Sequence, residues 1–248
     1  MKTGQGRINA TLVGIDGSGV RTLIGSLTGT LQPADEGERV WDGSTICLRA
    51  SRPESVDLAK VELLIVVTSA GQGVPSEIGP LWHSAAERGL PALIVVTHID
   101  NAAVALEEVT AICTRVLSAG GEVFMPWLPI LADDETVCGF INLLSEEIVE
   151  WGDGGPVVHQ SEQRHQDLIE DARAELCESI MLAVDDDTLF ADYMSGTPID
   201  GEVIELQMLE QTSRGLRHPV IGTALQPHLL GVGLLLDTIA GIDRQRKN

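Results

Sequence analysis

The sequence predicts an α/β fold, a doubly wound and mostly parallel sheet with an α+β insert before its last strand. Three short runs rich in β-branched residues show no polar alternation, which is typical of strands buried on both faces of a parallel sheet. These runs are INATLV at residues 8–13, ELLIVVT at 62–68 and ALIVVT at 92–97. Helical signals lie between them, and strands that alternate with helices indicate βαβ units.

Each predicted helix of this part has recognisable periodicity or ends. Residues 20–27 repeat apolar side chains at helical spacing, residues 75–89 begin with a proline and end with a glycine, and residues 102–118 stop before a glycine pair. Ligand sites in doubly wound sheets lie outside the carboxyl ends of the strands. We therefore expect the functional site in the loops that follow Val13 and Thr97.

The pattern changes past residue 120. VFMPWLPIL and CGFINLL, at residues 123–131 and 138–144, are predicted to be strands, and WGDGGP at 151–156 is predicted to be a turn-rich linker. Two helices are expected, at 161–183 and 201–214. The first lies on a surface, with an apolar side formed by Leu168, Ala172, Leu176, Ile180 and Leu182.

The parallel-sheet pattern returns near the end of the chain. The apolar run PVIGTA at 219–224 resembles a buried strand, and a last helix is expected at 228–242. The simplest division is a core formed by residues 1–119 and 216–248, with an inserted subdomain of residues 120–215.

Composition limits the partners that this chain can have. Apolar residues make up 44% of its 248 residues, enough for a buried core. Sixteen basic against 37 acidic residues give a net charge of −21, which repels nucleic-acid backbones and anionic lipid but suits a protein partner. The four cysteines show no CxxC spacing, and no signal peptide or membrane-spanning run is present. We therefore expect a cytoplasmic protein that binds neither nucleic acid directly nor a membrane.

The stretch VGIDGSGVRTLIGSL near the amino terminus has the build of a phosphate-binding loop. In a GxxxxGK[ST] loop, backbone N–H groups and the helix amino terminus bind phosphate, lysine bridges the terminal phosphates and the hydroxyl holds magnesium. Gly14 and Gly19 occupy the glycine positions, but Val20 and Arg21 stand where the lysine and the hydroxyl belong, and Thr22 comes one place late. An ordinary tight turn from strand to helix remains the alternative.

Two further elements follow predicted strands and suit a guanine base. THID, at residues 97–100, is close to the [NT]KxD motif, in which the aspartate accepts from two donors on the guanine edge. His98 replaces the lysine and Asp100 is kept, although Asp100 could equally cap the next helix. After the last strand, Thr223 and Ala224 could offer a backbone N–H to a base carbonyl.

Taken in this order, the elements resemble the G domain of the elongation factor G family of translational GTPases. The family's loop GHVDAGKTTL aligns without a gap on GIDGSGVRTL at residues 14–23. Residues 63–100 are similar to a stretch in which members of that family share the motifs GVQPQT, WRQA, GVP and NKMD. Residues 222–239 are similar to the family segment GSALKNKGVQPLLDAV. Residues 120–215 resemble the subdomain inserted before the final strand. The resemblance covers nearly the whole chain and implies a P-loop-NTPase-like fold.

The chain also departs from this family. Members carry a magnesium-binding threonine in a long effector loop and then DTPGH, whose aspartate and histidine serve magnesium and the attacking water. No DxxGH occurs between Leu31 and Leu64, and STICLRA at 44–50 stands where the strand leading into it belongs. These groups neutralise charge during phosphoryl transfer. We therefore expect absent or very weak GTP hydrolysis, and we assign no catalytic or metal-binding residue.

The resemblance implies a degenerate guanine-nucleotide site. GDP or GTP would bind weakly, GDP better, because the missing lysine and magnesium ligands matter most at the third phosphate; magnesium would not be well bound. Thr97 would tie the base-recognition loop to the phosphate loop, and Arg21 could partly replace the lysine charge. The expected nucleotide-binding residues are Gly14, Asp16, Gly17, Ser18, Gly19, Arg21, Thr22, Thr97, His98, Asp100, Thr223 and Ala224.

Two other functions stay open. The chain could be a nucleotide-independent, protein-binding pseudo-GTPase that acts through the insert and its acidic surface, or a GTPase completed by a partner. By resemblance, a protein partner would be associated with the ribosome. The chain ends where the family continues into further domains, so it is either an excised domain or a stand-alone one.

Three other residue patterns carry no site. Asp185, Asp186 and Asp187 cannot all face one metal ion and are expected to begin a solvated helix. The spacing of His159 and His165 lies outside common zinc motifs, and the loop around residue 18 lacks the glycines of GxSxG.

Overall fold

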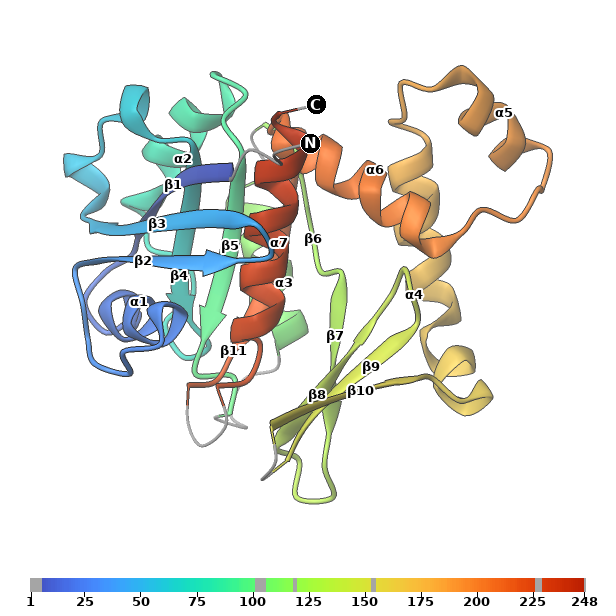
Figure 1. Cartoon of the computed structure of the whole chain (residues 1–248), viewed down its shortest axis with the longest axis horizontal. Coiled ribbons are helices and arrows are strands. Elements are labelled where there is room, and N and C mark those ends of the chain that lie inside the picture. Colours follow the sequence, from blue (N-terminus) through green and yellow to red (C-terminus); the bar gives the residue numbers. More distant parts are fainter. Residues whose placement is uncertain (1–5, 101–105, 118–119, 153–154, 226–228, 248) are drawn as a thin grey trace.

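A mostly parallel sheet forms the core of the protein, as the sequence predicted (Figure 1). The computed structural model describes residues 6–100, 106–117, 120–152, 155–225 and 229–247. Within them, seven strands pair in the order β2-β3-β1-β4-β5-β11-β6, and only β2 runs antiparallel to its neighbour. The strands are β1 (Gly6–Val13), β2 (Glu36–Trp41), β3 (Ser44–Ser51), β4 (Leu63–Ser69), β5 (Ala92–Thr97), β6 (Glu122–Phe124) and β11 (Arg217–Thr223).

Helices cover this sheet. Every residue of β4 and β5 is buried, which requires cover on both faces and confirms the prediction made from their uniform apolar runs. The last helix packs against β1, β3 and β11 and also against the first helix, so these two helices share a face. The helices of this part are α1 (Val20–Thr28), α2 (Ile78–Ala86), α3 (Leu106–Val116) and α7 (Val232–Gln245), with short 3-10 turns η1 (Pro53–Ser55) and η2 (Leu58–Lys60).

A second, antiparallel sheet forms the inserted part and lies to one side of the core in Figure 1. Its strand order is β10-β9-β8-β7, and three helices follow it along the chain. The elements are β7 (Trp127–Leu131), β8 (Val137–Asn142), β9 (Glu147–Gly152), β10 (Gly155–Gln160), α4 (Gln163–Met181), α5 (Asp187–Met194) and α6 (Gly201–Ser213). None of the helices described is long and apolar enough to cross a bilayer.

The structure corrects the prediction for residues 151–156. Of these residues, the four that the structure describes belong to strands and not to a linker, because Trp151 and Gly152 of β9 pair with Pro156 and Gly155 of β10 in antiparallel register. Gly155, one of the turn formers that suggested a linker, begins β10 and adopts φ +98°, which glycine tolerates.

Strand β2 was not predicted at all. Its sequence, EGERVW, alternates exposed and partly buried residues, and it lies at the edge of the core sheet. An edge strand of this kind lacks the uniform apolar run on which the other core strands were recognised.

The predicted apolar side of α4 was wrong in part. Leu168 and Leu182 are largely exposed, whereas Ile169, outside the predicted set, is buried with Leu176 and Ile180. The contacting face is therefore rotated toward Ile169, since neighbouring helical positions point in directions about 100° apart.

Three details concern the boundaries of predicted elements. Residues 122–124 fall within the range expected for the insert, yet β6 pairs with β11 at the edge of the core sheet; the rest of the predicted division stays a prediction. Asp186 caps α5 by accepting from the backbone N–H groups of Thr188 and Leu189, which confirms that the aspartate run begins a helix. The last helix begins at Val232, and residues 226–228, where its start was expected, lie outside the described residues.

Arg217 joins the core sheet to the helices of the inserted part. Its side chain is buried and donates to the carboxylate of Glu122 at 2.6 Å, to Gln211 Oε1 on α6 and to the carbonyl of Ser179 on α4. Burial lowers the pKa of Arg217, and the neighbouring Glu122 opposes that effect. One guanidinium at the start of β11 therefore holds parts of four elements together.

The substitution Arg217→Ala is expected to lower the free energy of unfolding by about 2 kcal/mol or more, because hydrogen bonds to a charged, buried group are among the strongest in proteins. Urea unfolding followed by circular dichroism measures this. Arg214→Ala is the matched control, since its ion pair with Asp185 is about half exposed and is worth less than about 1 kcal/mol. Equal unfolding midpoints for the two variants would contradict this role for Arg217.

Candidate functional site

The carboxyl ends of β1, β3, β4 and β5 meet at one edge of the core sheet, because these strands are parallel neighbours. The loop from β1 to α1 opens there onto a cavity of about 610 Å³. Its lining combines this loop, the start of α1, the end of β3 and the loop after β5: Gly14, Ile15, Asp16, Gly17, Gly19, Val20, Arg21, Thr22, Asp35, Ala50, Ser51, Arg52 and His98. Most of the residues expected to bind phosphate are therefore brought together.

Glycines define the shape of this loop. Gly17 and Gly19 adopt φ of +89° and +82°, in the left-handed region that favours glycine. A Cβ on Gly14 would lie 2.3 Å from Ser18 Oγ and 2.7 Å from the carbonyl oxygen of Val67, too close for any other residue. The conformation of this turn therefore requires glycine at all three positions.

The loop ends at the amino terminus of α1. Gly19 precedes the helix and accepts from Leu23 N at 2.8 Å, and no side chain caps this end. The first N–H groups of a helix have no partner within it, so they are open to an anion.

Ser18 contributes an unusual polar atom. Its side chain is fully buried, and its Oγ has no hydrogen-bond partner among the described residues. Its backbone is engaged, since Ser18 N donates to Ile15 O at 3.0 Å. A buried hydroxyl without a partner is costly. Ser18 is also absent from the lining of the cavity, unlike the glycines on either side of it.

The lysine position offers no positive charge. Val20 is partly buried and packs against the hydrophobic core. Arg21 lines the cavity, but its Nη2 lies 2.8 Å from Asp35 Oδ2, so a carboxylate already pairs with its charge. Thr22 is exposed on the next position of the helix. Among the described residues, no group of three or more His, Cys, Asp or Glu could hold a metal ion.

The expected link between the two loops is present. Thr97 is fully buried, and its Oγ1 donates to the carbonyl oxygen of Ser18 at 2.8 Å. His98 adopts φ +59°, and its Nδ1 lies 2.9 Å from Thr97 Oγ1. Its ring also lies against the phosphate loop, with Cε1 3.3 Å from the position of a Cβ on Gly19. The sequence THID therefore places its first two residues directly on the phosphate loop.

Asp100 lies apart from these contacts. It is exposed and lines a hollow of about 420 Å³ with Ser69, Gly71 and His98. The alternative that Asp100 caps the next helix concerns residues 101–105, which lie outside the described residues.

The expectation for Thr223 and Ala224 is not met. The N–H of Ala224 donates to Leu230 O at 3.1 Å in a β-bridge, so it is already paired and is not directed at a base carbonyl. Thr223 is fully buried, with its Oγ1 3.5 Å from Val96 O. Neither residue lines the cavity or the hollow beside Asp100. The sequence could not show this bridge, because it forms with a residue beyond the motif.

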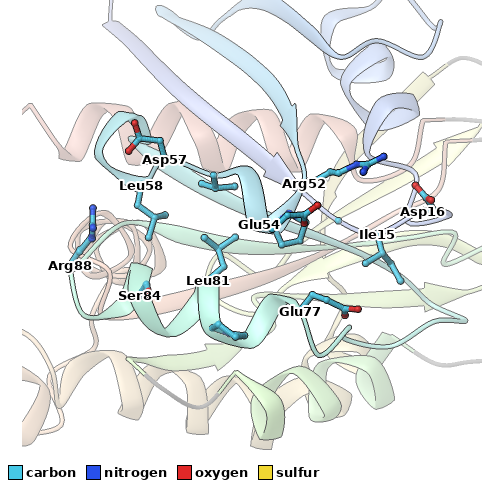
Figure 2. A pocket seen from close by; sticks show the side chains of 14 residues that line it. Ile15, Asp16, Arg52, Glu54, Asp57, Leu58, Glu77, Leu81, Ser84 and Arg88 are labelled. Atoms are coloured by element: carbon cyan, nitrogen blue, oxygen red, sulfur yellow. The ribbon is translucent and has the colours of Figure 1, made fainter.

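Sequence reasoning missed Arg52, Asp35 and Gln72. The carbonyl of Asp16 accepts from Gln72 Nε2 at 3.3 Å, which ties the phosphate loop to the segment after β4. Arg52 directly follows β3, so the rule that parallel strand ends meet could have identified it. It also lines a larger cleft of about 960 Å³ that runs from the phosphate loop to α2 (Figure 2).

The substitution Thr97→Val removes the Oγ1 donor while it keeps the side-chain shape. We expect about 1 kcal/mol lower stability and faster amide exchange across residues 14–19, because Ser18 O loses its partner. Hydrogen exchange read by mass spectrometry measures the loop directly. Thr223→Val is the control, since its hydrogen bond is long and does not touch this loop. Unchanged exchange at residues 14–19 in the Thr97 variant would contradict the expected link.

Known proteins similar to this chain include elongation factor G-like proteins and an elongation factor G. No protein-family model matches the sequence. Two relatives called elongation factor G-like protein, from Mycobacterium tuberculosis strains CDC 1551 / Oshkosh and ATCC 25618 / H37Rv, are each 27% identical over 249 residues, 86% of this chain and 34% of the relative. Elongation factor G 2 of Syntrophus aciditrophicus strain SB is 29% identical over 178 residues, 68% of this chain and 24% of its own length. The chain thus spans about a third or less of these relatives.

A solved structure supports the fold. A crystal structure of a protein from Thermus thermophilus superposes with a TM-score of 0.79 and covers 96% of this chain and 40% of its own, at 21% identity. At this identity the likeness concerns the fold alone. It agrees with the predicted mixed α/β class and its mostly parallel sheet.

Proposed function

Since the chain is a relative of the elongation factor G family with a P-loop GTPase-like fold, we propose that it is a guanine-nucleotide-binding module with little or no intrinsic GTP hydrolysis. The conformation of the phosphate loop carries this proposal. A loop with two left-handed glycines leads into an uncapped helix amino terminus, and Thr97 ties it to the segment that holds Asp100.

Different loops would bind the phosphates and the base of the nucleotide. Backbone N–H groups of Gly17, Gly19 and the first turn of α1 would bind phosphate oxygens, as helix amino termini do for anions. Asp100 would accept from donors on the guanine edge, and its exposure leaves the carboxylate accessible. His98 lies between the two, in contact with the phosphate loop and lining the hollow of Asp100.

Weak hydrolysis follows from the charges that are missing around the phosphates. Phosphoryl transfer depends on cations that neutralise the terminal phosphate, each worth orders of magnitude in rate. Val20 replaces the lysine, Arg21 is paired with Asp35, and the segment after β3 forms two short 3-10 turns without a DxxGH sequence. The missing lysine and magnesium ligands matter most at the third phosphate. GDP is therefore the favoured ligand, and magnesium contributes little to its binding.

A second function is favoured by one observation. Ala224 N–H is paired with Leu230, which removes one contact that a guanine base would use. A protein-binding module that needs no nucleotide is consistent with this and with the charge of −21. The similarity to elongation factor G-like proteins supports the further proposal that either activity takes place in the cytoplasm, with a protein partner associated with the ribosome.

Calorimetric titration of nucleotide-free protein separates these two functions. We expect GDP to bind with micromolar affinity, about 8 kcal/mol, and ADP not to bind, because Asp100 recognises guanine. Asp100→Asn should weaken GDP binding at least about tenfold, since an amide cannot accept from both donors. Asp133→Asn, which changes an exposed residue between β7 and β8, is the matched control. No binding at millimolar GDP would refute the nucleotide-binding function.

Turnover of GTP with magnesium is expected to stay below about 10⁻⁴ s⁻¹, the order of slow intrinsic GTPases. Phosphate release from purified protein measures it. Val20→Lys should tighten GTP binding more than GDP binding, because the restored ammonium lies at the position that serves the terminal phosphates. Rapid magnesium-dependent turnover by the unmodified protein would show that other groups replace the missing ones.

A further inference from the structure

The residue that follows β3 is brought to the phosphate loop by strand register. Val13, the last residue of β1, is paired with Ser51, the last residue of β3, in a parallel ladder. The next residues, Gly14 and Arg52, therefore leave the sheet side by side at its carboxyl edge. Both line the phosphate-loop cavity.

The backbone at Arg52 is well defined. It precedes Pro53, which restricts it to extended conformations, and its φ and ψ are −83° and 147°. Its carbonyl accepts from Ser55 N at 2.9 Å and from Ser51 Oγ at 3.3 Å. The start of the side chain is thus fixed, while its guanidinium remains exposed.

Most arginines of this acidic protein are already paired, but Arg52 is not. Among the described residues, only Arg52, Arg88 and Arg115 have a guanidinium with no ion pair, hydrogen bond or ring contact. Of these, only Arg52 lines the phosphate-loop cavity. The arginines paired with carboxylates are Arg7, Arg21, Arg49, Arg164, Arg173, Arg214, Arg217, Arg244 and Arg246, and Arg39 lies over Trp41.

The direction of the side chain agrees with its position. Figure 2 shows Arg52 extending toward Asp16 of the phosphate loop, whereas Arg88 lies at the opposite end of the cleft. Asp16 and Glu54 also line this cleft, but neither carboxylate is within 4.0 Å of the Arg52 guanidinium. The charge of Arg52 therefore faces the loop without being neutralised by a close partner.

We propose that Arg52 supplies, from the end of β3, the cation that the phosphate loop lacks at Val20, and that it binds the phosphates of the nucleotide. The inference rests on the proposed function and names the group that makes phosphate binding possible in a protein of charge −21. A guanidinium is suited to this because its planar donors match phosphate oxygens in pairs. Arg21, the cation nearest in sequence to the missing lysine, is held by Asp35 and is not that group.

Titration of the whole chain with GDP and with inorganic pyrophosphate tests this assignment. Arg52→Ala should weaken binding of both ligands by about 10- to 100-fold, the range for loss of a charged hydrogen bond. Arg88→Ala is the matched control, because it removes an arginine whose guanidinium has no ion pair or hydrogen bond among the described residues from the far end of the same cleft, where the nearby Asp57 feels its charge. The Arg88→Ala variant should bind GDP and pyrophosphate within about twofold of the unmodified protein, because salt screens a charge at the far end of the cleft from the phosphate loop. Arg52→Lys should restore part of the binding.

The outcomes separate this inference from the proposed function. Equal pyrophosphate binding by the unmodified protein and the Arg52→Ala variant would overturn the assignment, as would equal losses in the Arg52 and Arg88 variants. Pyrophosphate binding that depends on Arg52 without any GDP binding would support the assignment and refute guanine-nucleotide binding. No binding of either ligand at millimolar concentration would overturn both. Circular dichroism confirms that each variant is folded.

Discussion

Parallel pairing of β1 with β3 on one side and β4 on the other decides which loops of this chain meet. Because every strand of that group ends at the same edge, residues far apart in sequence converge there without any specific long-range contact. The glycine-rich turn, the exposed Arg52 and the loop of Thr97 all follow strand ends. The hydrogen bond from Thr97 Oγ1 to Ser18 O then fixes two of these loops to each other.

The core strands could be predicted because strands buried on both faces consist of runs of mostly apolar residues, which are recognisable in the sequence. Strands β4 and β5 are buried throughout and consist mainly of apolar residues, and the turn between β1 and α1 has the glycines that its shape requires. Strand β2 and the hairpin of β9 and β10 could not be recognised in this way. Their residues alternate or are rich in turn formers, and partner strands elsewhere decide their pairing.

The site was predictable to a similar extent. The contact of Thr97 with the phosphate loop was expected from the resemblance to the elongation factor G family, and the structure contains it. The pairing of Arg21 with Asp35 and of Ala224 with Leu230 depends on side chains and loops whose course the sequence does not reveal. Arg52 was overlooked because motif reasoning looked for a cation within the loop, whereas the structure brings one from the neighbouring strand.

Strand β11 connects two distant regions through one stiff element. At its carboxyl end, the carbonyl of Thr223 accepts from the N–H of Ile99, inside the THID loop, and at its other end Arg217 is bonded to α4 and α6. Its seven residues span about 20 Å, and neighbours on both sides resist bending. One paired strand therefore links the THID loop to the helices α4 and α6, which fixes the distance between these two regions of the molecule.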